Sequence, residues 1–361
     1  MSDILIVGGG IIGLLTAREL ALSGEKVTVV DKHGIGTESS WAGGGILSPL
    51  YPWRYADPVT SLASWGQRIY PELIEDLKIK TGLDPELEHS GLLIIEPSEF
   101  EPALAWAKKW QQKMEIIEAS AIEEIEPALA KQESEKAIWL PEVKQVRNPR
   151  FVKSLRKYLE LQGMKVKENV HVTDFIIKDN QVCGVKTPEG ELLADKVVVA
   201  GGAWSADLLQ KLNVVIKVEP VKGQMILFKT NPGSIKRIVL SQDRYVIPRR
   251  DGRVLVGSSL EYAGFDKSTS EQVREELCNE AIRIIPELEK ANVEHHWAGL
   301  RPGSPDGIPY ICEHPEFKGL YINSGHFRNG VVLGPASARL MADIVLQRET
   351  ILNTDNYQCN R

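Results

Sequence analysis

The sequence predicts an α/β fold, because three segments share one pattern of strand, glycine turn and helix. They begin at residues 3, 195 and 319. Each opens with a short apolar run typical of a buried strand, breaks at glycines and continues with apolar residues at helical spacing. The chain has 361 residues, 43% hydrophobic and 25% charged, which suits one large or two modest globular domains. We therefore expect a mostly parallel sheet whose glycine turns meet at one ligand.

The first segment predicts a βαβ unit. Its strand, helix and second strand are DILIVG, GGIIGLLTARELALSG and KVTVVD. Gly8, Gly10 and Gly13 stand in the G-x-G-x-x-G register, which permits a tight turn, close approach to a pyrophosphate and close packing of helix on strand. Asp31 ends the second strand, where its carboxylate can accept hydrogen bonds from adenosine ribose hydroxyls. The unit predicts a Rossmann-like dinucleotide-binding domain, and both NAD and FAD fit it.

Three later segments favour a flat ring system as part of the ligand. TESSWAGGGILSP (37–49) combines small residues with three glycines, so its backbone can approach a ring closely, although the same composition fits a flexible surface loop. DKVVVAGGAWSADLL (195–209) and GLYINSGHFRNGVVLGPASARLMADIVL (319–346) repeat strand, glycine turn and helix. A helix that starts near Asn329 or Gly330 would direct its N-terminal dipole at the turn and stabilise the negative charge of a reduced flavin.

Composition excludes several other classes. The formal net charge of -6 and the pI near 5.8 provide no basic field for a nucleic acid. No apolar run approaches 18 residues and no signal peptide opens the chain, so we expect a protein that is neither exported nor membrane-spanning. The polar stretch 130–136 is short enough for a surface loop.

The cysteines and histidines indicate neither a disulfide framework nor a metal site. The four cysteines lie far apart without a Cys-x-x-Cys pair, and they are Cys183, Cys278, Cys312 and Cys359. Their spacing argues against a disulfide framework and against a cysteine zinc site, and a reducing cytoplasm fits best. His295 and His296 are adjacent and point to opposite faces of a strand, which disfavours joint metal ligation. We expect no metal.

The chain resembles the glycine oxidase and D-amino acid oxidase family of FAD-dependent amine oxidoreductases, most closely its branch linked to thiamine biosynthesis. The matching segments span nearly the whole chain: IVGGGIIGLLTA, ESSWAGGGILSPLYPW, VRNPRFVKSL, VEPVKGQMILF, RYVIPRRDGRVLVGSSLE, WAGLRPGSPDGIPYI and GHFRNGVVLGPAS. The resemblance implies FAD as the cofactor. It also implies a glutathione-reductase-like FAD-binding domain of residues 1–85, 144–214 and 301–361. An antiparallel-sheet α+β substrate domain of 86–143 and 215–300 would be interleaved with it and roof the flavin.

The resemblance further implies a set of cofactor-binding residues in the glycine turns and the small-residue segment. They are Gly8, Gly10, Ile11, Ile12, Gly13, Asp31, Lys32, Ser39, Ser40, Trp41, Ala42, Gly43, Gly44, Gly45, Val172, Gly201, Gly202, Trp204, Arg301, His326, Phe327, Arg328, Asn329 and Gly330. At His326 we expect contact through the backbone rather than acid–base chemistry by the ring.

Arg301 is the first candidate for substrate binding. The preceding segment, HHWAGL, predicts a strand, and the following segment, PGSPDG, is rich in turn-forming residues. Arg301 should therefore lie at the end of a strand. A guanidinium binds a carboxylate bidentately, whereas a structural salt bridge is the alternative use. The resemblance implies that Tyr245 shares the substrate carboxylate, that Arg328 helps to close the site and that Leu260 forms a pocket wall. From the residues alone, Tyr245 fits simple packing and Arg328 a solvated surface position.

The resemblance implies oxidative deamination of glycine, sarcosine or small D-amino acids such as D-alanine. A hydride would pass from the substrate Cα to flavin N5, and O2 would take the electrons to give H2O2. The imine would hydrolyse to glyoxylate or another 2-oxo acid and ammonia, or supply the thiazole of thiamine. It also implies a homo-oligomer, a tetramer. Two alternatives stay open: a D-amino acid or N-methyl amino acid dehydrogenase that uses a quinone, and a nucleotide-binding protein without catalysis.

Overall fold

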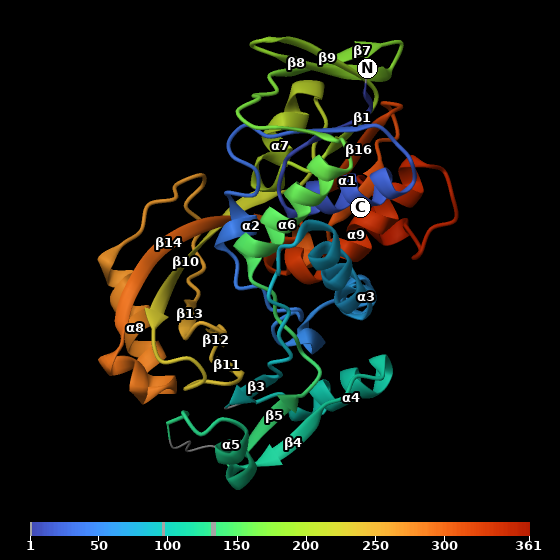
Figure 1. The fold of residues 1–361 in the computed structure, drawn as a ribbon. Helices are drawn as coiled ribbons and strands as arrows, with labels where there is room; N and C mark the ends of the chain where they lie inside the picture. The colour runs from blue at the N-terminus through green and yellow to red at the C-terminus, as the bar shows by residue number, and fades with distance from the viewer. Residues whose placement is uncertain (1, 96–97, 131–134) are drawn as a thin grey trace.

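The structure is a computed structural model that describes residues 2–95, 98–130 and 135–361. These residues form two eight-stranded sheets, shown in Figure 1 as separate layers. Most of the stretch expected as a surface loop at 130–136 lies outside the described residues. The α/β fold class is confirmed, whereas the residue boundaries between the two domains stay a prediction.

The first sheet contains the predicted βαβ unit. Its strand order is β15-β16-β9-β1-β2-β6, and β7 and β8 extend it from β9. The pairs β1–β2, β1–β9, β9–β16 and β2–β6 are parallel, as the glycine returns predict. The strands are β1 (Ser2–Val7), β2 (Val27–Val30), β6 (Lys165–Lys167), β7 (Asp174–Lys178), β8 (Gln181–Thr187), β9 (Gly190–Val199), β15 (Tyr310–Glu313) and β16 (Leu320–Ser324).

Four helices cover one face of this sheet, and they are α1 (Ile11–Leu22), α3 (Asp57–Thr81), α6 (Asn148–Leu161) and α9 (Gly330–Val345). α1 packs against α6 and α9, and α3 packs against α6 and α9. Their apolar faces share one core cluster with the sheet, in which Leu14, Leu73, Phe151 and Leu340 are buried. On the other face, residues of the sheet, including its β7–β8 extension, and the short helix α7 (Ser205–Leu209) bury a second cluster. Both faces are therefore buried, as a parallel sheet requires.

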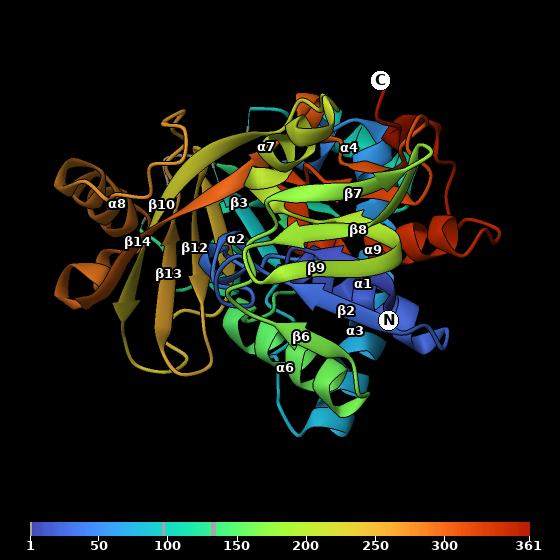
Figure 2. The same cartoon turned by 90° about the horizontal axis from the view of Figure 1, so that it is seen from above.

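The second sheet is mostly antiparallel and has the strand order β14-β10-β13-β12-β11-β3-β5-β4. Its strands are β3 (Leu92–Ile95), β4 (Glu115–Glu118), β5 (Lys136–Leu140), β10 (Glu219–Lys229), β11 (Ile238–Ser241), β12 (Arg244–Pro248), β13 (Arg253–Gly257) and β14 (Asn292–Gly303). The helices that accompany it are α4 (Phe100–Trp110), α5 (Ala119–Ile125) and α8 (Glu271–Ile284). In Figure 2, β10, β12, β13 and β14 run side by side, and α8 packs on the first three. The short helix α2 (Ser39–Ala42) contacts both α6 and β14 and so links the two layers.

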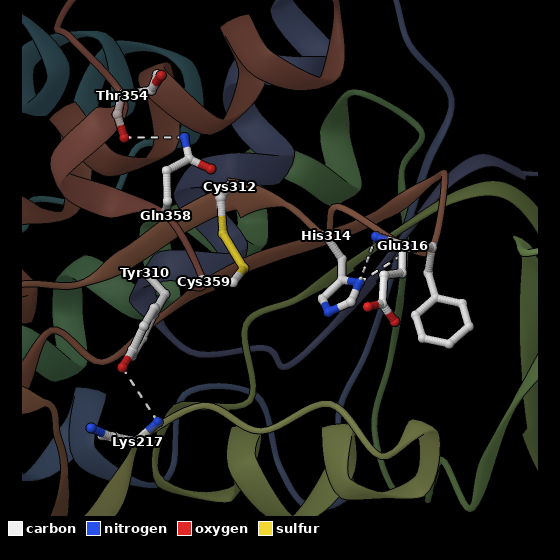
Figure 3. Close-up of a disulfide and its surroundings, with 9 residues drawn as sticks. Lys217, Tyr310, Cys312, His314, Glu316, Thr354, Gln358 and Cys359 are labelled. Atoms are coloured by element: carbon white, nitrogen blue, oxygen red, sulfur yellow. Dashed lines mark hydrogen bonds between the residues drawn. A yellow bond between two sulfur atoms is a disulfide. The ribbon is translucent and has the colours of Figure 1, made fainter. Parts of the chain in front are cut away.

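One cysteine prediction is wrong. Cys312 and Cys359 form a disulfide across a sequence separation of 47 residues, with their Cα atoms 6.6 Å apart. Cys312 is buried on β15, and Figure 3 shows the C-terminal segment brought back against that strand. Sequence spacing could not reveal the pair, because only the tertiary path of the C-terminal segment brings the two residues together. Cys183 and Cys278 are free thiols.

Among the residues described, no helix combines the length and the apolar character needed to cross a membrane.

Candidate active site

A cavity of about 430 Å³ lies where the two sheets meet, and it gathers most of the predicted site residues. Its wall includes the β1–α1 turn, the small-residue segment around α2, the glycines after β9 and the turn before α9. Tyr245 from β12 and Arg301 from β14 complete it. Every predicted cofactor-binding residue lines this cavity except Gly13 and Trp41.

Three predicted residues lie outside the cavity wall for identifiable reasons. Gly13 faces back toward the turn, where a Cβ would overlap the carbonyl oxygen of Gly8. Trp41 is 44% exposed and packs edge-on against Trp297, with ring centroids 5.3 Å apart. Leu260, predicted as a pocket wall, is 42% exposed in the loop after β13. Gly13 therefore serves helix packing, and a pocket role for Leu260 is not supported by its position.

The dinucleotide end of the cavity is built from backbone amides. Gly8 has a φ of +118°, and a Cβ there would overlap the carbonyl oxygen of Ala200. Asp31 accepts hydrogen bonds from the amide of Gly9 at 2.7 Å and from that of His33 at 2.8 Å. The predicted carboxylate therefore also holds the turn. The twelve-residue helix α1 begins directly after Gly10, so the turn and the helix N-terminus form an anion-binding site.

The small-residue segment is fixed by Arg249, which the sequence analysis missed. Its guanidinium donates to the Gly44 carbonyl at 2.8 Å, to the Gln145 Oε1 at 2.6 Å and to the Val146 carbonyl at 3.1 Å. Burial lowers the pKa of Arg249 to about 10, and the charge of Arg147 acts in the same direction. The segment is thus pinned against the cavity rather than flexible. Nothing local in RYVIPRRDG distinguishes this arginine from the next one.

The predicted helix start is confirmed, because α9 begins at Gly330 with Asn329 as its N-cap residue. Both residues line the cavity. The Asn329 Nδ2 and the Arg328 Nε are buried and have no hydrogen-bond partner within the part of the chain that the structure describes. A polar ligand at this wall would therefore find two donors and a helix dipole.

His326 lines the cavity, and its surroundings keep the imidazole ring uncharged. Its side chain is buried, and its Nε2 hydrogen-bonds to the Ser337 hydroxyl at 3.0 Å. Burial lowers the pKa of His326 to about 3, so the imidazole is neutral throughout the ordinary working range. This geometry supports the interpretation that His326 is not an acid–base group.

Arg301 lies at the other end of the cavity among neutral acceptors. Its Nη1 donates to the carbonyls of Lys222 at 3.2 Å and Ser259 at 3.3 Å, and its Nη2 donates to the Ser258 hydroxyl at 2.6 Å. Over the described residues, Arg301 forms no salt bridge. The salt-bridge alternative is therefore not supported.

Tyr245 and Arg328 lie within electrostatic reach of Arg301. Burial lowers the pKa of Arg301, while Tyr245 opposes that shift and the Arg328 charge adds to it. Two glycines leave space for the side chains of Arg301 and Tyr245. A Cβ at Gly223 would overlap the Arg301 guanidinium, and one at Gly257 would lie 3.0 Å from the Tyr245 hydroxyl. A tyrosine hydroxyl and two guanidinium groups in a partly buried cavity are suited to a small carboxylate.

The first sheet is Rossmann-like and carries a glycine turn suited to a phosphate. It shares one cavity with a second, antiparallel sheet that presents groups suited to an anion. This combination defines a dinucleotide-dependent oxidoreductase. Comparisons with known proteins give the family. Residues 3–344 match the family described as FAD dependent oxidoreductase, and the chain belongs to it.

The chain is also similar over its full length to individual members. It is 48% identical to the glycine oxidase of Pseudomonas putida, over 98% of this chain and 97% of that protein. It is 31% identical to the bifunctional protein ThiO/ThiG of Trichormus variabilis, over 96% of this chain and 53% of that protein. The crystal structure of glycine oxidase from Geobacillus kaustophilus matches with a TM-score of 0.93 at 29% identity, covering 100% of this chain and 98% of that one.

The cofactor is FAD, and the cavity fits it. Gly8 and Gly10 of the glycine turn line the cavity, where their backbone would hold a pyrophosphate, and Asp31 lines the same wall, where it could accept hydrogen bonds from a ribose. The unpartnered Asn329 Nδ2 and the start of α9 supply positive potential for the ring system. These residues belong to the first sheet and its helices, whereas Arg301 and Tyr245 come from the second sheet.

Proposed function

We propose that the protein is a glycine oxidase that also accepts sarcosine and small D-amino acids such as D-alanine, with O2 as electron acceptor. The nearly full-length similarity to the Pseudomonas putida glycine oxidase supports this reaction. FAD, held by the glycine turns and the start of α9, would supply the redox chemistry for oxidation of the substrate at Cα, with O2 reduced to H2O2. The released imine would hydrolyse to glyoxylate, or to another 2-oxo acid, and ammonia.

The residues of the chain would act mainly by positioning the substrate. Arg301 and Tyr245 bind the carboxylate, and Arg328 closes the site from the α9 side. The observation that carries this proposal is that Arg301 is held by two carbonyls and a hydroxyl and forms no salt bridge among the described residues. The substrate carboxylate would supply that charge, and its orientation would aim the Cα hydrogen at the flavin.

The test is Arg301→Ala, assayed with glycine and with an amine that lacks a carboxylate. Removing one side of a buried charge pair costs about 2 to 5 kcal/mol, so kcat/KM for glycine should fall by a factor on the order of 30 to several thousand. Arg301→Lys should restore part of the loss, because the charge returns without the bidentate fork. Equal proportional losses for both substrates, or loss of FAD from the variant, would assign Arg301 to the scaffold.

A visible spectrum separates the oxidase from its alternatives. Anaerobic glycine should bleach the flavin, and air should restore the spectrum and release H2O2. Slow recovery in air with rapid recovery in a quinone would indicate a dehydrogenase. A spectrum unchanged by any amine would indicate a nucleotide-binding protein without catalysis.

The biological setting is also a proposal. The similarity to the bifunctional protein ThiO/ThiG supports a role in supplying the glycine imine for the thiazole of thiamine. We further propose a homotetramer with a cytoplasmic location, for which the cysteine spacing no longer argues because Cys312 and Cys359 form a disulfide. Sedimentation of a stable 40.2 kDa species at working concentration would exclude the tetramer.

A further inference from the structure

We propose that Ser258 is an additional substrate-binding residue, whose hydroxyl accepts a hydrogen bond from Arg301 and donates one to the substrate carboxylate. This inference rests on the carboxylate role of Arg301 proposed above. Ser258 follows directly after β13, is 8% exposed and lines the cavity.

The Ser258 hydroxyl accepts a hydrogen bond but donates none to another residue among those described. A serine hydroxyl has one donor and two acceptor positions. In this structure the Ser258 oxygen accepts from the Arg301 Nη2 at 2.6 Å, and Arg301 is the partner of this hydroxyl among the described residues. The O–H donor is therefore available to a ligand in the cavity. Accepting from a guanidinium also makes the hydroxyl a better donor, because hydrogen bonds in a chain polarise one another.

The donors of Arg301 point to the same arrangement. Both Nη1 donors and one Nη2 donor are used by the Lys222 carbonyl, the Ser259 carbonyl and the Ser258 hydroxyl. A guanidinium has five N–H donors, so two are not used by these three acceptors: the Nε–H and one on Nη2. A carboxylate has two oxygens and about four acceptor positions, which leaves room for a serine hydroxyl and a tyrosine hydroxyl beside the guanidinium.

The backbone of Ser258 is fixed on both sides. Arg244 donates to its carbonyl oxygen at 2.8 Å. The preceding residue, Gly257, pairs with Met225 on one side and with Tyr245 on the other. The Tyr245 hydroxyl lies over Gly257, so it stands one residue away from Ser258. The serine hydroxyl, the tyrosine hydroxyl and the Arg301 guanidinium thus converge on one part of the cavity.

The chain provides a matched control in Ser259. Its side chain is equally buried, at 7% exposed, and its hydroxyl accepts from the Gln224 amide at 2.8 Å and donates to Glu261. It is not part of the cavity wall, and its hydroxyl does not contact Arg301. Ser259→Ala therefore removes a buried hydroxyl from the same loop without removing the proposed donor.

The experiment measures acetate binding to the FAD-loaded enzyme by the change in the flavin spectrum, together with steady-state kinetics. Ser258→Ala should raise the acetate Kd by about 10- to 100-fold, the range for a hydrogen bond to a charged group. Ser258→Thr, which keeps the hydroxyl, should bind acetate within a few-fold of wild type. Ser259→Ala, which keeps the backbone carbonyl that accepts from Arg301, should raise the acetate Kd much less than Ser258→Ala does.

Kinetics add a readout that misfolding would not produce. Ser258→Ala should raise KM for glycine with little change in kcat, because the carboxylate contact is made equally in ground and transition states. An amine without a carboxylate should be oxidised as fast by Ser258→Ala as by wild type.

Three outcomes overturn the inference: an acetate Kd in Ser258→Ala within twofold of wild type, equal losses in Ser258→Ala and Ser259→Ala, or equal losses in Ser258→Ala and Ser258→Thr. If Arg301→Ala still weakens acetate binding in those cases, the carboxylate role of Arg301 stands without Ser258. If Arg301→Ala does not weaken acetate binding, the proposed function fails instead.

Discussion

Two glycines of the first turn should give opposite results when each is replaced by alanine. Gly8 has a φ of +118°, and an added Cβ would overlap the backbone of Ala200. Gly10 has a φ of -74°, and its added Cβ would lie 3.0 Å from the Ser40 hydroxyl as the nearest atom. Both residues line the cavity. Gly8→Ala therefore strains the fold, whereas Gly10→Ala mainly places a methyl group where the pyrophosphate approaches.

The magnitudes separate the two variants. For Gly8→Ala, an alanine in an unfavourable backbone region costs about 1 to 3 kcal/mol, and overpacking against a fixed carbonyl costs about 1 to 3 kcal/mol more. The free energy of unfolding of the FAD-free protein should fall by roughly 2 to 6 kcal/mol. Gly10 is the N-cap residue of α1, and alanine is a poorer N-cap by about 1 kcal/mol or less.

The assay combines urea unfolding of the FAD-free proteins with titration of FAD. Gly10→Ala should unfold close to wild type but bind FAD much more weakly, while Gly8→Ala should already be destabilised without FAD. FAD-free Gly8→Ala as stable as wild type, or a loss of stability in Gly10→Ala equal to that in Gly8→Ala, would contradict these separate roles of the two glycines.

Four further predictions concern other contacts. Asp31→Asn should weaken FAD binding by about tenfold, because a charged acceptor becomes neutral; fluorescence titration measures it. Arg249→Lys should lower the free energy of unfolding by about 2 to 4 kcal/mol in urea, since a point charge cannot hold Gly44 and two further acceptors. Burial lowers the pKa of His326 to about 3, below the ordinary histidine pKa near 6.5 of the unfolded chain. The free energy of unfolding should therefore fall as the pH drops below 6.5, by about 2 kcal/mol at pH 5. In urea unfolding, His326→Gln should lose less of this free energy between pH 7 and pH 5 than wild type does. Cys359→Ser should lower the free energy of unfolding by about 2 to 4 kcal/mol, and a reductant should abolish the difference from wild type.

The first sheet could be predicted from the sequence better than the second, because local sequence patterns indicate its strands, turns and helices. The strand, glycine turn and helix at the N-terminus recur in the structure as β1, α1 and β2. The returns at Gly201 and before Gly330 also appear, and both line the cavity. These features depend on residues close together in the chain, where periodicity and glycine placement are informative.

The second sheet and its supporting contacts depend on pairs far apart in the chain. The parallel pairing of β3 with β11 joins residues 92–94 to residues 238–240, and no local pattern specifies that partner. Arg249 and Ser258 were missed for the same reason, since their roles arise only when distant backbone segments meet. The disulfide of Cys312 with Cys359 is a third case.

The proposed carboxylate site follows from the strand order of the second sheet. β14, β10, β13 and β12 are neighbours in that order (Figure 2). They supply, in the same order, the Arg301 guanidinium, the Lys222 carbonyl, the Ser258 hydroxyl just beyond the strand end and the Tyr245 hydroxyl. Side chains alternate between the two faces of a sheet, so a slip of one residue in β12 would turn Tyr245 away from the cavity. The dinucleotide turn can thus be recognised from its own sequence, whereas the substrate site requires the register of four strands.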